Sequence, residues 1–324
     1  MTSPTTFPSN WIPTYDTCDE VSVYCPVKYT TLGYYPNLGV NIFLAIGFGL
    51  AALLTVAIGI WKRTWGFSIA VASGCFLECA GYIGRCFVSH NPWNGDAFKL
   101  QIVSIVLAPT LVCAGIYLTL KHIVEAIDRT LSRVSPRLYP IVFIPADVSC
   151  LAIQAIGGGI AAAAGVFNYE LLKHGNRVIM AGVSLQVVVL VAFGLLGGDY
   201  LWRARRHFKN GGHDSSPDGA SLFTDKKFRL FLIAVAGAYA AILIRCIYRI
   251  AEMAGGWANP IMQHESSFVV LESFMLLIAC WLLSGFAPGL FFPQMTSSSS
   301  KRAEGAETEK RGGVESDSPG META

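Results

Sequence analysis

Seven long apolar segments constrain this chain more than any other feature of its sequence. An α-helix needs about 20 apolar residues to cross the hydrocarbon core of a bilayer, and each segment is long enough. Only 14% of the residues are charged, against about 25% in a typical soluble domain. The sequence therefore predicts an all-α, polytopic membrane protein with seven transmembrane helices in one bundle. The expected spans are residues 38–60, 66–88, 100–120, 139–166, 178–200, 229–251 and 267–291.

The predicted bundle occupies residues 37–291, between two polar segments. Residues 1–36 are rich in Pro and Thr and lack the pattern of a signal peptide, so we expect an extracellular N-terminal tail. Residues 292–324 contain few apolar side chains and are expected to form a disordered cytoplasmic tail. An extracellular position would allow a disulfide between Cys18 and Cys25 in the first tail, and two free thiols are the alternative.

Lys and Arg are distributed unevenly between the two sides of the predicted bundle. The loops after spans one, three and five contain two, four and seven of them, and the C-terminal tail contains four. The other side has five of the 24. Because cytoplasmic loops are enriched in Lys and Arg, this asymmetry places the N-terminus outside and the C-terminus in the cytosol.

Charged and polar side chains recur at helical spacing inside the apolar spans. Glu78 and Arg85 are seven residues apart in span two. They share a helix face but lie about 10.5 Å apart along the axis, too far to pair with each other. The same kind of spacing recurs in spans four, six and seven, with Asp147 and Gln154, then Arg245, Arg249 and Glu252, then Glu265 and Glu272.

Ionised side chains are costly in a bilayer and should face the bundle interior, where they meet opposite charge or water. With the predicted orientation, the charges of spans two, six and seven gather in the outer half of the membrane, and Asp147 lies nearer the cytosol. We therefore predict a polar ligand or translocation cavity in that outer half. The alternative is that these groups only fix the helix register or extend to the headgroups, for which Arg85 and Glu265 are best placed.

Two prolines and several absent motifs refine this prediction. Pro109 and Pro145 lie inside spans and are expected to kink them. The small residues of "GGGIAAAAG" (157–165) are typical of close helix packing. We find no phosphate-binding loop, no metal-ligand spacing and no nucleophile–base set, so we expect neither an enzyme nor a cofactor. A net charge of +2 gives no reason to expect nucleic-acid binding.

The motifs "ECAGYIGR", "LAPTLVCAGIY", "DVSCLAIQAIGGG", "RCIYRIAE" and the "PG" at 288–289 carry a family resemblance. In order and spacing, from about Asn37 to Gly289, the chain resembles the fungal lipid-translocating exporter family of 7-aminocholesterol-resistance and sphingoid long-chain-base resistance proteins. The resemblance implies a fungal plasma-membrane protein with a role in lipid export or in resistance to lipid and toxic-compound stress. It also implies that the following residues are functional: Glu78, Tyr82, Arg85, Pro109, Tyr117, Asp147, Gln154, Arg245, Arg249, Glu252 and Glu265.

The chain departs from the family pattern in and after span seven. Val269 stands where the family usually has Tyr, and Glu272 stands where it usually has Asp. Ala287 replaces a His that often precedes the Pro-Gly pair. These differences bear on the choice of ligand more than on the fold.

Two functions from different classes fit the sequence. In the first, the protein moves or handles an amphipathic lipid, a sphingoid base or a sterol-like lipid, at the outer leaflet. Glu78 and Glu272 would then meet a cationic headgroup, and the arginines would hold those carboxylates or meet phosphate. In the second, the protein is a seven-span receptor or sensor whose basic 201–229 loop binds a cytosolic partner, although that loop also fits an orientation signal or a contact with anionic lipid. Membrane lipids are the expected partners in either case, and the oligomeric state is left open.

Overall fold

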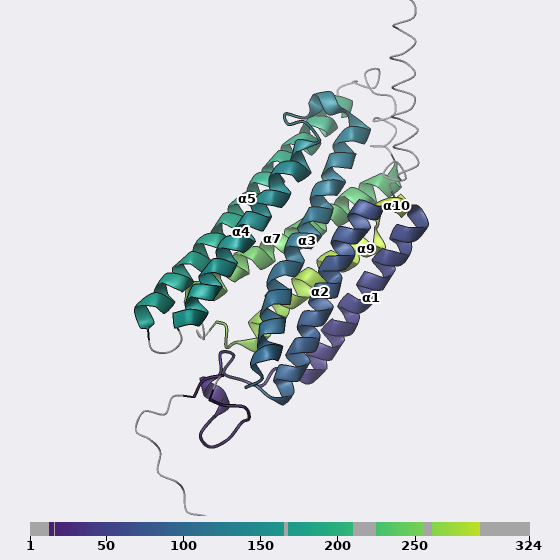
Figure 1. The fold of residues 1–324 in the computed structure, drawn as a ribbon. Coiled ribbons are helices and arrows are strands. Elements are labelled where there is room, and N and C mark those ends of the chain that lie inside the picture. The colour runs from purple at the N-terminus through teal and green to yellow at the C-terminus, as the bar shows by residue number, and fades with distance from the viewer. Residues whose placement is uncertain (1–12, 16, 165–167, 210–224, 256–260, 292–324) are drawn as a thin grey trace, which may run out of the picture.

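The computed structural model describes residues 13–15, 17–164, 168–209, 225–255 and 261–291, which form helices joined by irregular segments, with no strand among them. Seven helices in this part of the chain are long and apolar enough to cross a membrane, as the sequence predicted. Figure 1 shows them as one elongated bundle. The first six spans are α1 (Leu38–Lys62), α2 (Trp65–His90), α3 (Gly95–Ile127), α4 (Leu138–Ala164), α5 (Tyr169–Lys209) and α7 (Lys226–Ala254). The seventh, Glu265–Phe291, is built from several short elements.

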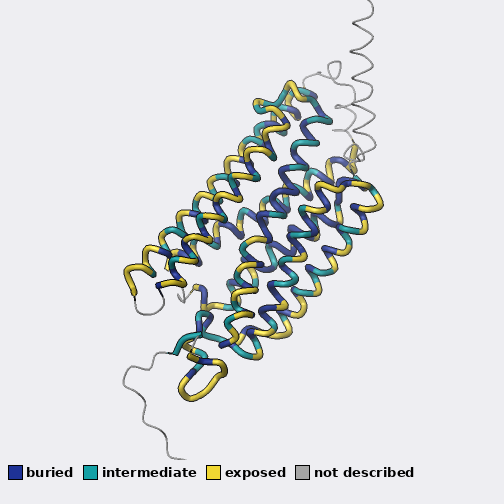
Figure 2. Tube along the Cα trace, viewed as in Figure 1, coloured by how far each residue is buried: buried dark blue, intermediate teal, exposed yellow. Residues whose placement is uncertain are grey.

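The helices pack mainly against their neighbours in sequence. The pairs α1–α2, α2–α3 and α4–α5 have the closest contacts, and the seventh span returns to pack against both α7 and α1. α3 is the most enclosed span, whereas α4 and α5 bury the smallest share of their apolar segments. Figure 2 shows the buried positions along the inner faces of the bundle. The main apolar core includes an aromatic cluster of Tyr117, Phe143 and Phe193, in which the Tyr117 and Phe193 ring centroids are 4.5 Å apart.

Two spans are longer than the apolar pattern predicted. The helix α3 extends over 33 residues and α5 over 41, beyond the expected 100–120 and 178–200. Hydropathy marks only the part of a helix that lipid surrounds, and backbone hydrogen bonding continues through charged residues beyond it. As a result, Arg203 and Arg206 lie on α5 and not in a loop, and Arg203 Nε is 3.1 Å from Asp199 Oδ2 one turn earlier. Residues 210–224 of the proposed partner-binding loop lie outside the described part of the chain.

The seventh span differs most from the single helix that was expected. It comprises α8 (Glu265–Ser267), a π-helical segment η3 (Phe268–Phe274), α9 (Met275–Gly285) and α10 (Pro288–Phe291). A π-helical turn is wider than an α-turn, so residues seven apart no longer share a face. Glu272 is consequently buried, whereas Glu265 is only half-buried. The prediction that these two glutamates lie on one face is therefore wrong.

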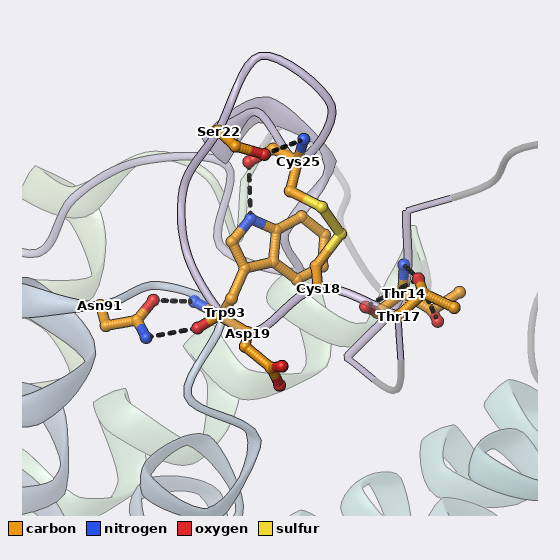
Figure 3. Close-up of a disulfide and its surroundings, with 8 residues drawn as sticks. All are labelled: Thr14, Thr17, Cys18, Asp19, Ser22, Cys25, Asn91 and Trp93. Carbon is orange, nitrogen blue, oxygen red and sulfur yellow. Dashed lines mark hydrogen bonds between the residues drawn. A yellow bond between two sulfur atoms is a disulfide. The ribbon is translucent and has the colours of Figure 1, made fainter. Parts of the chain in front are cut away.

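The described part of the N-terminal tail is folded against one end of the bundle. Cys18 and Cys25 form a disulfide, and the Trp93 indole Nε1 donates a hydrogen bond to the Cys25 carbonyl at 2.8 Å. The Asn91 side chain donates to the Asp19 carbonyl at 2.7 Å, which fastens the same loop to the α2–α3 turn (Figure 3). A disulfide was one of the two alternatives left open above. Residues 292–324, expected to be disordered, lie outside the described part.

Small residues bring α4 and α5 close together, as their sequence indicated. A methyl group built on Gly157 would lie 2.7 Å from the Ile179 backbone nitrogen, and one on Gly175 would lie 2.7 Å from that of Ala161. No side chain larger than hydrogen fits at either position. Gly158 and Gly159 differ from these, because a methyl group on either would meet nothing within 4 Å.

Candidate functional site

A buried ionic network joins α7 to the π-helical segment. Arg245 Nη2 lies 2.5 Å from Glu272 Oε1, and Arg249 Nε lies 3.8 Å from the same oxygen. Arg249 Nη1 also contacts Glu252 Oε2 at 2.8 Å, one turn along α7. The side chains of Arg245 and Glu272 are 4% and 1% exposed. The network thus gives both arginines carboxylate partners away from lipid.

Arg245 has a second role that depends on Pro109. A proline has no backbone N–H, so Pro109 leaves the carbonyl of Ile105, four residues earlier, without its helical partner. Arg245 Nη2 donates a hydrogen bond to that carbonyl at 2.9 Å. Pro109 lies inside α3 and Pro145 inside α4, as expected. The α7 arginine therefore satisfies the backbone group that the α3 proline frees.

Glu78 and Arg85 on α2 have very different surroundings from this network. Neither forms an ion pair within the described residues, and Glu78 Oε1 is buried there without a hydrogen-bond partner. Arg85 is fully buried, and its Nη2 donates to the Tyr34 hydroxyl at 2.7 Å. Its guanidinium carbon also lies 4.2 Å from the centroid of the Phe268 ring. Arg85 is therefore enclosed by the bundle and does not extend to the headgroups.

Tyr34 comes from the N-terminal segment and not from a span. Burial raises the pKa of its phenol, so the hydroxyl is protonated at neutral pH. It accepts the hydrogen bond from Arg85 and keeps one O–H to donate. The N-terminal segment thereby contributes directly to the polar interior of the bundle.

A cavity of about 1060 Å³ lies between α3, α4, α5 and α7, at the end that the N-terminal segment covers. Its wall is apolar along α3 and α4, where Val103, Leu107 and Leu151 line it. Small residues on α4, including Gly158 and Ala162, widen it. Its polar lining includes Tyr34, Arg85, Gln101, Gln154, Arg249 and Glu252.

Four of the ten residues predicted to form the cavity line it, namely Arg85, Gln154, Arg249 and Glu252. A small second pocket of about 10 Å³ adjoins Gln154 and Arg249 and is also lined by Arg245. Volume of this order is about what one water molecule needs. The polar end of the large cavity and the ionic network therefore have residues in common.

Apart from Glu78, the other predicted residues have structural partners away from the large cavity. Tyr82 stacks on Phe48 with ring centroids 5.5 Å apart, and the Tyr117 hydroxyl donates to Asp147 Oδ2 at 2.7 Å. Glu265 Oε1 accepts from the Asn37 backbone N–H at 2.6 Å, next to the start of α1. Glu78 and Glu272 also lie outside the cavity wall, and Glu272 is already neutralised by two arginines. The expectation that these two carboxylates meet a cationic headgroup therefore has no support in the geometry.

The lining residues missed from the sequence include Tyr34, Gln101 and Phe268. Gln101 carries a usable signal, since an amide near the start of an apolar span is unusual, and its buried Oε1 has no partner in the described structure. Tyr34 and Phe268 carry none, because tyrosine in a tail and phenylalanine in a span are ordinary. Within the described residues, no group of three His, Cys, Asp or Glu side chains is placed to hold a metal ion.

Comparison with known proteins identifies relatives of the chain. A family described as "RTA1 like protein" matches residues 71–295. The sphingoid long-chain base transporter RSB1 of Saccharomyces cerevisiae is 30% identical over 289 residues, which cover 82% of this chain and 75% of that protein. Protoporphyrin uptake protein 1 of the same yeast is 28% identical over 68% of this chain and 67% of its own length. Protein RTM1 of S. cerevisiae is 26% identical, covering 71% and 69%. No solved structure matches.

Proposed function

We propose that this chain, which belongs to the RTA1-like family, binds an amphipathic lipid in the cavity between α3, α4, α5 and α7 and moves it across the membrane. The cavity carries this proposal. At about 1060 Å³ it is at the upper end of the size of small-molecule sites, and it combines an apolar wall with a charged end. An amphipathic lipid has the same two parts. Two of the relatives named above are described as a transporter and an uptake protein, and these descriptions agree with a transport function more than with an enzymatic one.

The apolar wall offers a route from the bilayer. Val103 and Leu107 of α3 line the cavity and are 56% and 36% exposed. Ala155 of α4 likewise lines the cavity and is exposed. A lipid entering between α3 and α4 would keep its chains against these apolar side chains while its headgroup reached the polar end.

The proposed orientation places the N-terminal segment outside the cell, with the cavity in the outer half of a plasma membrane. The uneven distribution of Lys and Arg supports this orientation. The Cys18–Cys25 disulfide supports it independently, because disulfides persist mainly in oxidising compartments. The chain has no phosphate-binding loop, so the movement would be facilitated exchange or would be coupled to protons through a buried carboxylate such as Glu78.

Two adjacent glycines provide a matched test. Gly158 lines the cavity and Gly159 does not, although a Cβ atom added to either would meet nothing within 4 Å. The Gly158→Trp variant should therefore fill the cavity without disturbing helix packing, and Gly159→Trp should add the same bulk outside it. In liposomes containing the purified protein, a fluorescent single-chain lipid is tested once with an amine headgroup and once with a phosphate headgroup. Movement between leaflets should be faster than in empty vesicles for at least one of the two lipids. Gly158→Trp should return the rate to that of empty vesicles, and Gly159→Trp should leave it unchanged.

Equal rates in vesicles with and without the wild-type protein would contradict the proposal. So would equal effects of the two tryptophans, because the cavity would then not be the route. Ligand-dependent binding of a cytosolic protein, without any lipid movement, would favour the receptor function instead.

A further inference from the structure

We infer that the lipid bound in this cavity carries an anionic headgroup, a phosphate or a carboxylate, and that Arg85 is the residue that binds it. This inference rests on the proposed function, since it assumes that the cavity is a lipid site. It concerns the headgroup alone, so it can fail while the cavity remains a lipid site.

Arg85 differs from Arg245 and Arg249, the two arginines of the ionic network, in having no carboxylate partner. Arg245 and Arg249 pair with Glu272, and Arg249 pairs also with Glu252. Arg85 is 0% exposed, and within the described part of the chain its Nε and Nη1 form no hydrogen bond. A guanidinium has five N–H donors, and leaving a buried charge without its hydrogen bonds is costly. A ligand that supplied acceptor oxygens and a negative charge would satisfy this group.

The surroundings of Arg85 fit a planar, bidentate contact. The Phe268 ring lies over the guanidinium at 4.2 Å, and the Tyr34 ring centroid is 5.9 Å from the guanidinium carbon. Aromatic rings over the flat face of a guanidinium leave the N–H groups at its edge for oxygen acceptors. Phosphate and carboxylate groups match that edge with two parallel hydrogen bonds. The protonated Tyr34 hydroxyl could donate a further bond to the same anion.

Most of the other charged residues that line the cavity are paired with each other, which leaves Arg85 without a compensating charge. Glu252 is paired with Arg249 at 2.8 Å, and Asp96 is paired with Lys99 at 3.2 Å. Asp19 belongs to the exposed part of the N-terminal segment. A cationic headgroup would meet Arg85 with repulsion and would compete with Arg249 for Glu252. An anionic headgroup meets neither obstacle.

The same chemistry could come from a free anion, and the apolar wall argues against that source. Val103, Leu107 and Leu151 would gain nothing from inorganic phosphate, whereas they would bury the chain of an alkyl phosphate. The experiment should therefore compare probes that share a chain and differ in their headgroup, together with inorganic phosphate alone.

Equilibrium binding to the purified full-length protein in a non-ionic detergent provides the test. The probes are hexadecyl phosphate, hexadecylamine, hexadecanol and inorganic phosphate. We expect hexadecyl phosphate to bind about tenfold more tightly than hexadecylamine, and inorganic phosphate to bind far more weakly. The Arg85→Gln variant should weaken hexadecyl phosphate binding about tenfold or more without changing hexadecanol binding, and Arg85→Lys should recover part of the loss. Arg177→Gln, which removes an exposed guanidinium of α5 outside the cavity wall, is the matched control and should have no effect.

Hexadecylamine binding as tightly as hexadecyl phosphate would overturn the inference, as would an unchanged headgroup preference in Arg85→Gln. Inorganic phosphate binding as tightly as the alkyl phosphate would also overturn it, since the site would then serve a free anion. The comparison of headgroups on the wild-type protein needs no variant, so a misfolded Arg85→Gln protein would leave the test intact. If Gly158→Trp still abolished hexadecanol binding in any of these cases, the proposed function would stand and only the headgroup would be wrong.

Discussion

Glu272 is the residue on which the buried charges depend most directly. Its Oε1 lies 2.5 Å from Arg245 and 3.8 Å from Arg249, and its side chain is 1% exposed. Two positive charges would lose a partner if this carboxylate were removed, because both arginines lie within 4 Å of it. At a buried ion pair, the loss of one member costs more than the loss of both, since the remaining charge stays desolvated.

We therefore predict that Glu272→Leu lowers the free energy of unfolding by about 3–5 kcal/mol. The double variant Arg245→Met/Glu272→Leu should be more stable than Glu272→Leu alone, because it removes one of the stranded charges. Thermal denaturation of the three proteins in the same detergent measures this order. A double variant less stable than Glu272→Leu would show that Arg245 stabilises the bundle even without its carboxylate, and would contradict a cost of the stranded charge.

Residue spacing predicted part of this site because helix periodicity is a local property. The spacing of Arg245, Arg249 and Glu252 was sufficient to place them on one inward face of α7. The contact between Arg85 and Tyr34 joins positions 51 residues apart, and nothing local to either residue indicates it. The partner of Glu265 was not predictable either. It is the backbone N–H of Asn37, 228 residues away, and a backbone N–H carries no sequence signal that would identify it as the partner.

At the scale of helices, a backbone defect in one element is matched by a side chain from another. Pro109 frees the Ile105 carbonyl of α3, and Arg245 of α7 donates to it at 2.9 Å. The sequence predicted both helices and the position of the proline. It could not predict the hydrogen bond from Arg245 to the Ile105 carbonyl, because that bond depends on how α3 and α7 are aligned along their axes. The π-helical segment was missed for a similar reason: residues Phe268–Phe274 have the mostly apolar composition of any span, which gives no sign of a wider turn.

This match predicts an energetic coupling between Pro109 and Arg245. In the Pro109→Ala variant the alanine N–H can satisfy the Ile105 carbonyl, so Arg245 is no longer needed for that purpose. The destabilisation caused by Arg245→Met should therefore be about 1 kcal/mol smaller in the Pro109→Ala background than in the wild type. Glu272 is present in all four proteins, so its stranded charge cancels in the comparison. Additive effects of the two substitutions would contradict the proposed role of Arg245.

At the scale of the whole molecule, the two ends of the bundle have different chemistry. One end carries the disulfide, Trp93 and the N-terminal segment that covers the cavity. The opposite end carries Arg133 and Arg203, both within 3.1 Å of Asp199.

Hydropathy was sufficient to predict the spans and their number, because burial in lipid acts on each segment separately. The folded N-terminal cover was not predictable in this way, since its contacts with the α2–α3 turn are polar and specific.

The proposed orientation of these two ends rests on the disulfide and the basic loops, and cysteine chemistry on intact cells can test it. We expect a membrane-impermeant maleimide to label the protein only after Cys18 and Cys25 have been reduced by an impermeant reductant. The Cys18→Ser/Cys25→Ser variant is the control, because the remaining described cysteines are buried or half-buried in the spans. A cysteine introduced by Ser135→Cys, an exposed position between α3 and α4 at the opposite end, should react only after permeabilisation, since positive loops remain in the cytosol. Labelling of Ser135→Cys on intact cells, with Cys18 and Cys25 unreactive, would reverse the orientation and would place the cavity in the inner half of the membrane.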